Sequence, residues 1–150
     1  MAQQTIKNRI LLSDVILHEY DSSTGYTRDK ANVTPDGVMK CGLLVARDKG
    51  LDLGATWTKA TTEDLVDTKE LAVFLGDAFQ YETEVELLAV KEGEPNAVVL
   101  ARGNAILASW VLEVVNKEAG LTDEDLKKAY ALLAQKGILV EKTYGKRPTV

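Results

Sequence analysis

Residue types that commonly carry chemistry are sparse in this sequence. His18 is the single histidine and Cys41 the single cysteine among 150 residues. No other histidine or cysteine stands at metal-ligand spacing from His18, and a Ser-His-Asp triad would have to recruit it from the start of the chain. Cys41 adjoins Gly42 in an apolar stretch, where a thiol usually acts as a small buried hydrophobe, although a thiolate nucleophile stays open as an alternative. We expect no catalytic, metal-binding or cofactor-binding residue, and no cofactor.

Three glutamates form the other candidate for chemistry. Glu82, Glu84 and Glu86 alternate with less polar residues in YETEVELL. A two-residue period predicts a strand with one wet and one buried face. Carboxylates also bind calcium, but a row on one face is spaced too regularly to form a cage around one ion. We interpret the row as the solvated face of a strand.

Known catalytic motifs are missing. The sequence contains no GxGxxG, P-loop, HExxH or GxSxG. Nucleotide binding and the common hydrolase mechanisms therefore have no motif support. We expect a non-enzymatic protein.

Composition predicts one compact domain with arms. The chain has 45% hydrophobic and 27% charged residues, which suffices for one core. A net charge of -5 argues against a nucleic-acid surface, and no apolar run approaches the ~20 residues of a membrane-spanning helix. Asp14 interrupts the apolar patch near the N-terminus, so we expect no secretory signal. A single cysteine excludes an internal disulfide and fits synthesis in a reducing cytoplasm. We expect a protein partner.

Residues 1–25 are expected to form an N-terminal arm that ends in the turn-rich DSSTG. Their apolar positions fit neither strict alternation nor a helical stripe, and we favour an extended conformation. Left in water, each such side chain forfeits roughly 1.5–3 kcal/mol, so the arm should bury them on a partner. The alternative, that the segment is the first strand or helix of the core, stays open. The arm residues in question are Ile10, Leu11, Leu12, Val15, Ile16 and Leu17.

Turn signals divide the middle of the chain into short strands. TPDG at residues 34–37 predicts a tight turn, and the VMKCGLLVARD that follows reads as a strand with a bulge at Gly42. Residues 82–91 and 97–102 flank EGEPN and predict an antiparallel hairpin.

The C-terminal region predicts a helix over 123–136. Thr122 and Asp125 form a capping box, and Leu121 can staple onto Leu126. Lys136 and Gly137 suit the helix end, and ILVEK then predicts a final strand. A narrow apolar face should pack on the sheet; it consists of Leu126, Ala129, Tyr130 and Leu133.

Residues 104–118 fit either a strand and a turn or a buried helix. Trp110 in this region is a candidate contact between subunits, because tryptophan is enriched in interface hot spots. The alternative is that Trp110 belongs to the core. The tail, residues 143–150, carries Lys146 and Arg147 as a candidate rim contact to an acidic neighbour.

The order of features over residues 26–142 resembles the lambda-type head decoration proteins of tailed bacteriophages. The ending is the most telling part, because family members close with a capped helix, an Ala/Leu-rich face and a terminal strand. A longer N-terminal arm, a Lys-Arg tail and the Trp110 region depart from the family pattern. The resemblance is carried by YTRDKANVTPDG, MKCGLLV, an acidic loop, AVVLARGNA and GLTDEDLKKAYALLAQKGILVEK.

This resemblance implies an α+β, β-rich domain of the β-tulip type over residues 26–142, with the arm at 1–25 and a tail at 143–150. It implies a homotrimer that binds the major capsid protein at three-fold positions on the outer surface of the expanded head. Such a protein is made in the host cytoplasm and cements the virion against internal genome pressure, with no nucleic acid or membrane as partner. An arm that adds a strand to a capsid sheet would supply main-chain hydrogen bonds.

Two alternatives remain. Another virion or tail-junction structural protein would share this composition and differ in symmetry and partner. A small oligomeric enzyme could assemble a site between subunits from scattered acidic residues and Cys41.

Overall fold

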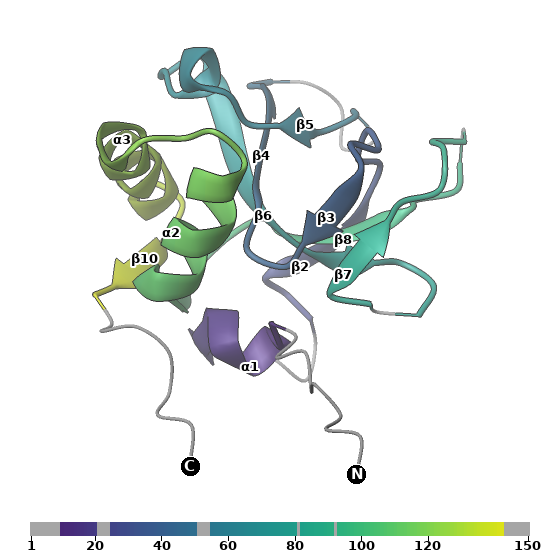
Figure 1. Ribbon diagram of the computed structural model, residues 1–150, viewed down its shortest axis with the longest axis horizontal. Coiled ribbons are helices and arrows are strands. Elements are labelled where there is room, and N and C mark those ends of the chain that lie inside the picture. Colours follow the sequence, from purple (N-terminus) through teal and green to yellow (C-terminus); the bar gives the residue numbers. More distant parts are fainter. Residues whose placement is uncertain (1–9, 21–24, 51–54, 81, 92, 143–150) are drawn as a thin grey trace, which may run out of the picture.

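The chain folds as a small α+β domain that consists mostly of strands, with three α-helices (Figure 1). The computed structural model describes residues 10–20, 25–50, 55–80, 82–91 and 93–142. The expected arm therefore lies within the described residues only from Ile10, and the tail at 143–150, with Lys146 and Arg147, lies outside them.

A five-stranded antiparallel sheet forms the centre, in the order β2-β8-β6-β4-β5. Its middle strand β6 is the longest, and its apolar sequence ELAVFLG is buried almost throughout because both faces are covered. The strands are β2 (Arg28–Ala31), β4 (Leu44–Asp48), β5 (Thr58–Lys59), β6 (Lys69–Asp77) and β8 (Ala97–Leu100).

The two edges of this sheet meet. Val33, just after β2, forms a parallel bridge with Trp57, just before β5. Trp57 N–H donates to the Asn32 carbonyl at 2.8 Å, and Thr34 N–H donates to the Trp57 carbonyl at 2.9 Å. The sheet therefore closes into a small barrel, which leaves fewer free strand edges.

Two smaller sheets flank the barrel. In the first, β9 lies between β1 and β10, antiparallel to β1 and parallel to β10. The second is a two-stranded antiparallel ribbon of β3 and β7. Their strands are β1 (Ile16–Glu19), β9 (Ala105–Ala108), β10 (Ile138–Glu141), β3 (Val38–Lys40) and β7 (Glu84–Glu86).

Helices α2 (Ser109–Glu118) and α3 (Asp123–Ala134) lie on one side of the barrel, and the short α1 (Leu12–Val15) lies at the bottom of the view in Figure 1. A 3₁₀ turn, η1, spans Thr62–Asp64. Asn116 of α2 is fully buried; its amide donates to the Gly42 carbonyl at 3.0 Å, and its oxygen accepts from Leu44 N–H at 2.9 Å. Gly42 has φ +102°, and a Cβ there would lie 3.1 Å from Val111. A glycine is thus required where α2 meets the barrel.

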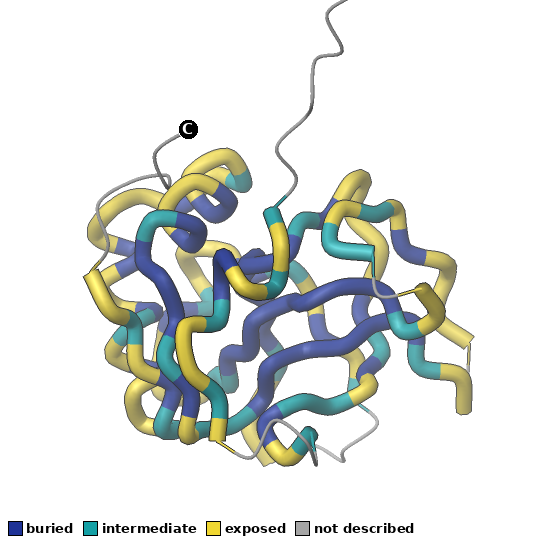
Figure 2. Tube along the Cα trace, turned by 90° about the horizontal axis from the view of Figure 1, so that it is seen from below, coloured by how far each residue is buried: buried dark blue, intermediate teal, exposed yellow. Residues whose placement is uncertain are grey.

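One continuous apolar core joins the barrel, the helices and the β1-β9-β10 sheet. Figure 2 shows the buried stretches in the middle of the molecule, with exposed segments around them. The largest fully buried side chains include Trp57, Phe74, Leu107, Leu133 and Ile138.

The C-terminal prediction is confirmed except for the end of the helix, which is Ala134 and not residue 136. Helix α3 begins at Asp123; Asp125 N–H donates to Thr122 Oγ1 at 3.2 Å, and Thr122 N–H donates to the Asp125 carboxylate at 2.9 Å. Gly137 adopts φ +80° after the helix, and β10 follows. Of the predicted apolar face, Leu126, Ala129 and Leu133 are buried, and Tyr130 packs partly buried against the core.

The predicted hairpin is wrong. Strand β7 pairs with β3, whereas β8 pairs with β2 and β6. A bridge between Lys91 and Glu94 closes the turn between the two segments but does not pair one segment with the other. The glutamate alternation itself is real, because Glu84 and Glu86 are exposed and Leu87 is buried. Likewise, VMKCGLLVARD is two strands, β3 and β4, separated by a turn at Cys41 and Gly42.

Candidate interaction surfaces

The apolar N-terminal segment is part of the domain from Ile10 onward. Val15 is fully buried, and strand β1 pairs with β9 through Ile16 and Leu107. The expectation of an extended arm outside the core is therefore wrong for residues 10–19, and the alternative of a first core element applies there. The reason is that β9 supplies, within the same chain, the partner that these side chains need.

The six predicted contact residues divide by exposure. Val15 is in the core, and three others, Ile10, Leu12 and Ile16, pack partly buried against it. Leu11 and Leu17 remain exposed. Only these two are thus free in the chain itself to contact another molecule.

A bidentate ion pair holds this segment to the barrel. Arg28 on β2 donates from Nε and Nη2 to the two carboxylate oxygens of Glu19, each at 2.8 Å, and Thr27 Oγ1 also donates to that carboxylate. Burial alone would raise the pKa of Glu19, but the hydrogen bonds and the positive charge of Arg28 hold it below its ordinary value. The end of β1 is therefore fixed beside the start of β2.

Two exposed tyrosines lie beside this ion pair. The Tyr20 and Tyr26 rings meet edge to face with centroids 6.2 Å apart. The Arg102 guanidinium lies 5.7 Å from the centre of the Tyr26 ring, donates to the Tyr26 carbonyl at 2.6 Å, and forms an ion pair with Asp29. Exposed tyrosine and arginine side chains are typical of protein interfaces.

Neither candidate nucleophile sits in a catalytic arrangement. His18 lies exposed on β1. Cys41 is fully buried, and burial raises the pKa of its thiol to about 12, with Asp14 acting in the same direction and Arg28 against it. The thiol is therefore protonated at neutral pH and acts as a small hydrophobe.

In the part of the chain that the structure describes, no three His, Cys, Asp or Glu side chains lie close enough to hold one metal ion. Within the same residues, no helix is both long and apolar enough to cross a membrane.

A charged cluster surrounds the buried Trp57. Arg47 lies 4.1 Å above the ring centre, and Lys136 Nζ lies 5.6 Å from it. Glu70 accepts from both cations, at 3.2 Å and 2.9 Å. Burial lowers the pKa of Lys136, and Glu70 opposes this only in part. Since Lys136 follows α3 and Glu70 belongs to β6, the cluster ties the last helix to the barrel.

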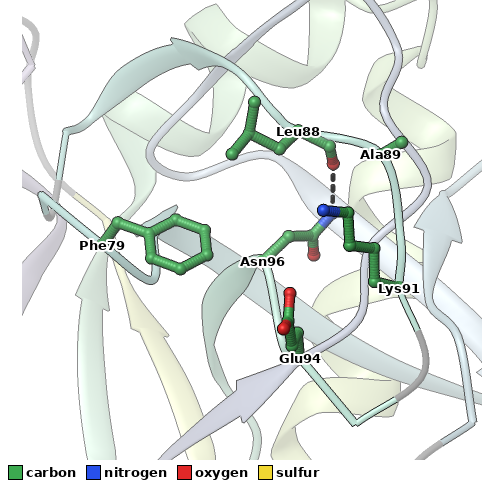
Figure 3. Close-up of a pocket in the computed structure, with 6 residues that line it drawn as sticks. All are labelled: Phe79, Leu88, Ala89, Lys91, Glu94 and Asn96. Carbon is green, nitrogen blue, oxygen red and sulfur yellow. Dashed lines mark hydrogen bonds between the residues drawn. The ribbon is translucent and has the colours of Figure 1, made fainter.

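The described surface also carries a small hollow beside the β3-β7 ribbon. Its volume is about 40 Å³, and Figure 3 shows Phe79 and Leu88 on either side of it. Buried Asn96 forms part of its wall and donates to the Leu88 carbonyl at 2.8 Å. Ala89, Lys91 and Glu94 complete the lining.

Trp110 lies on α2, partly buried against the core of its own chain. Residues 104–118, which the pattern left undecided, contain β9 from Ala105 onward, followed directly by α2. The role of Trp110 between subunits stays a prediction.

Sequence reasoning missed Glu19, Arg28, Phe79 and Leu88. Glutamate and arginine nine residues apart carry no signal that they meet, and an apolar residue gives no sign in sequence that it is exposed. Comparisons with protein-family models, with curated proteins and with solved structures each find no match to this chain.

Proposed function

We propose that this protein decorates the head of a tailed bacteriophage, as a trimer that binds the major capsid protein on the outside of the expanded shell and cements it. The proposal starts from the resemblance over residues 26–142 and includes a domain of the β-tulip type. The capped α3 and the terminal β10, on which that resemblance depends most, are present in the fold.

The observation that best supports a binding role is the state of β1. Among the described strands it pairs with β9 alone, which makes it an edge strand, and an edge strand can accept a further strand from a partner. Leu17 on this strand and Leu11 just before α1 are exposed, and so are Tyr20, just after β1, and Tyr26, whose ring meets that of Tyr20. An edge strand flanked by apolar and tyrosine side chains suits addition of a strand from a capsid subunit.

Contacts of this kind stabilise the expanded shell by mass action. A protein that binds only the expanded shell stabilises that form in proportion to its occupancy. Three linked copies engage neighbouring capsid subunits together, so modest single contacts add to a tight one. An acidic protein, with a net charge of -5, is suited to the outer surface rather than to the packaged DNA.

The test is co-sedimentation with expanded and unexpanded shells of the phage that carries this gene. The wild type should pellet with expanded shells and stay in solution with unexpanded ones. Leu17→Asp should bind expanded shells at least tenfold more weakly, because hot-spot losses at interfaces reach this size. Val66→Asp is the matched control, since Leu17 and Val66 are equally exposed at 46% and Val66 lies in the loop after η1. Equal binding of the wild type to both shells, or to neither, would contradict the proposal.

A further inference from the structure

The two most exposed large hydrophobic side chains of the described residues lie at the same site on the surface. Leu88 is 66% exposed and Phe79 59%, and both line the same hollow (Figure 3). Isolated exposed apolar residues are ordinary, but two that flank a shared hollow form a patch. Such a patch is typical of a contact with another molecule.

Two buried polar side chains hold the patch in shape. The Asp77 carboxylate accepts from the backbone N–H groups of Phe79 at 3.3 Å, Gln80 at 3.1 Å and Glu82 at 2.6 Å. Asn96 donates to the carbonyls of Leu88 and Val33, each at 2.8 Å, and accepts from Val33 N–H at 2.8 Å. These hydrogen bonds hold the backbone of Phe79 and Leu88 in place, so little conformational entropy is lost at these two positions when a partner docks.

The size of the hollow limits its occupant. Its volume of about 40 Å³ is far below the several hundred Å³ of a typical small-molecule site. The Asn96 side chain forms its hydrogen bonds with backbone atoms of Val33 and Leu88, so it holds the loops in position. A small apolar group on a protein surface is the occupant of the right size.

The charges at the rim of the hollow indicate which protein docks there. Lys91 and Glu94 are both exposed and line the hollow, so the patch carries one charge of each sign. When the patches of three copies meet around a three-fold axis, Lys91 of one copy can lie beside Glu94 of the next, so each contact around the ring joins opposite charges. The ribbon strand β7 also lies on the other side of the molecule from β10 and α3 (Figure 1).

From these observations we infer that the surface formed by Phe79, Leu88, Lys91 and Glu94 is where a second copy of this chain docks, and that it forms the contact of the trimer. The inference rests on the proposed function in one respect, because the number of copies, three, is taken from it. It leaves the α1-β1 surface available for the capsid.

Light scattering on a size-exclusion column tests the surface. The wild type should elute with the mass of a multimer of the 16.4 kDa chain. Leu88→Asp should weaken self-association by roughly thirty-fold or more, as loss of an interface hot spot does. Leu139→Asp is the control, because Leu139 is also an exposed leucine, at 54%, but lies on β10. Circular dichroism should show all three proteins folded.

A charge exchange between copies tests the pairing. Lys91→Glu and Glu94→Lys should each self-associate poorly, and mixing the two variants should restore a larger species that contains both. A wild type that stays a single chain at about 100 µM, or a Leu88→Asp variant that keeps the wild-type mass, overturns the inference. So does a Leu88→Asp variant that stays multimeric but loses shell binding, because the patch would then contact the capsid. Shell binding by the wild type is measured in a separate experiment, so a failure of the proposed function can be distinguished from a failure of this inference.

Discussion

Glu19 and Arg28 form a two-pronged ion pair, with both nitrogen–oxygen distances at 2.8 Å, that joins the first strand of the chain to the barrel. The Glu19 side chain is almost fully buried and the Arg28 side chain about one third exposed. Because β1 is only four residues long, this pair is a principal link between the N-terminal segment and the rest of the fold.

Glu19→Gln should lower the free energy of unfolding by about 1–3 kcal/mol, since it removes a charged hydrogen-bonding partner of Arg28. The folded-state pKa of Glu19 lies below its ordinary 4.5, so the ion pair stabilises the fold above that pH. This stabilisation is lost as pH falls through the lowered pKa. Urea unfolding of both proteins at neutral pH and near pH 3 should therefore show a difference that shrinks with acid. A difference independent of pH would contradict the assignment.

Deletion of residues 1–20 should destabilise the domain strongly. It removes fully buried Val15 and the whole of β1, whose burial and pairing contribute at least ~3 kcal/mol together. The exposed Leu17 provides the control, and Leu17→Ser should change stability by no more than about 0.5 kcal/mol. Thermal melting checks both; a truncated protein as stable as the full chain would show that the segment is dispensable.

The parts of the fold that sequence predicted are those with local determinants. Thr122 and Asp125 are three residues apart and specify the start of α3 by themselves. The partner of a strand, in contrast, is set across the whole chain: Glu84 pairs with Lys40 and Leu100 with Arg28. A turn between two apolar segments therefore predicted a hairpin that the barrel does not form.

The N-terminal segment shows the same limit of sequence-based prediction. Irregular apolar spacing between Ile10 and Leu17 could not decide between core and arm, because the deciding partner, β9, lies about ninety residues later. The Phe79 and Leu88 patch could not be predicted either, since exposure depends on which loops Asp77 and Asn96 hold together.

Leu133→Ala and Leu126→Ala should each lower the free energy of unfolding by about 2–5 kcal/mol, because both side chains are buried where α3 meets the core. Leu139→Ala, on the exposed face of β10, should have an effect of less than about 1 kcal/mol. Denaturant midpoints that place Leu133→Ala level with Leu139→Ala would refute this packing.

Gly103→Ala should be strongly destabilising for a steric reason. A Cβ at Gly103 would lie 2.2 Å from the carbonyl oxygen of Gly137, a backbone atom that cannot move aside easily. We expect a loss of about 2 kcal/mol or more. Gly93→Ala meets no atom within 4 Å and is strained only by its φ of +77°, so it should lose about 1–2 kcal/mol and less than Gly103→Ala. Calorimetry of the two variants under the same conditions should show the lower melting temperature for Gly103→Ala.

Electron cryo-microscopy of expanded shells incubated with the purified protein tests capsid decoration most directly. The account predicts added density on the outside of the shell at three-fold and quasi-three-fold positions, in clusters of three copies, with the α1-β1 surface against the capsid protein. Unexpanded shells treated in the same way should stay bare. Density at the tail junction alone, or no added density on either kind of shell, would contradict the account.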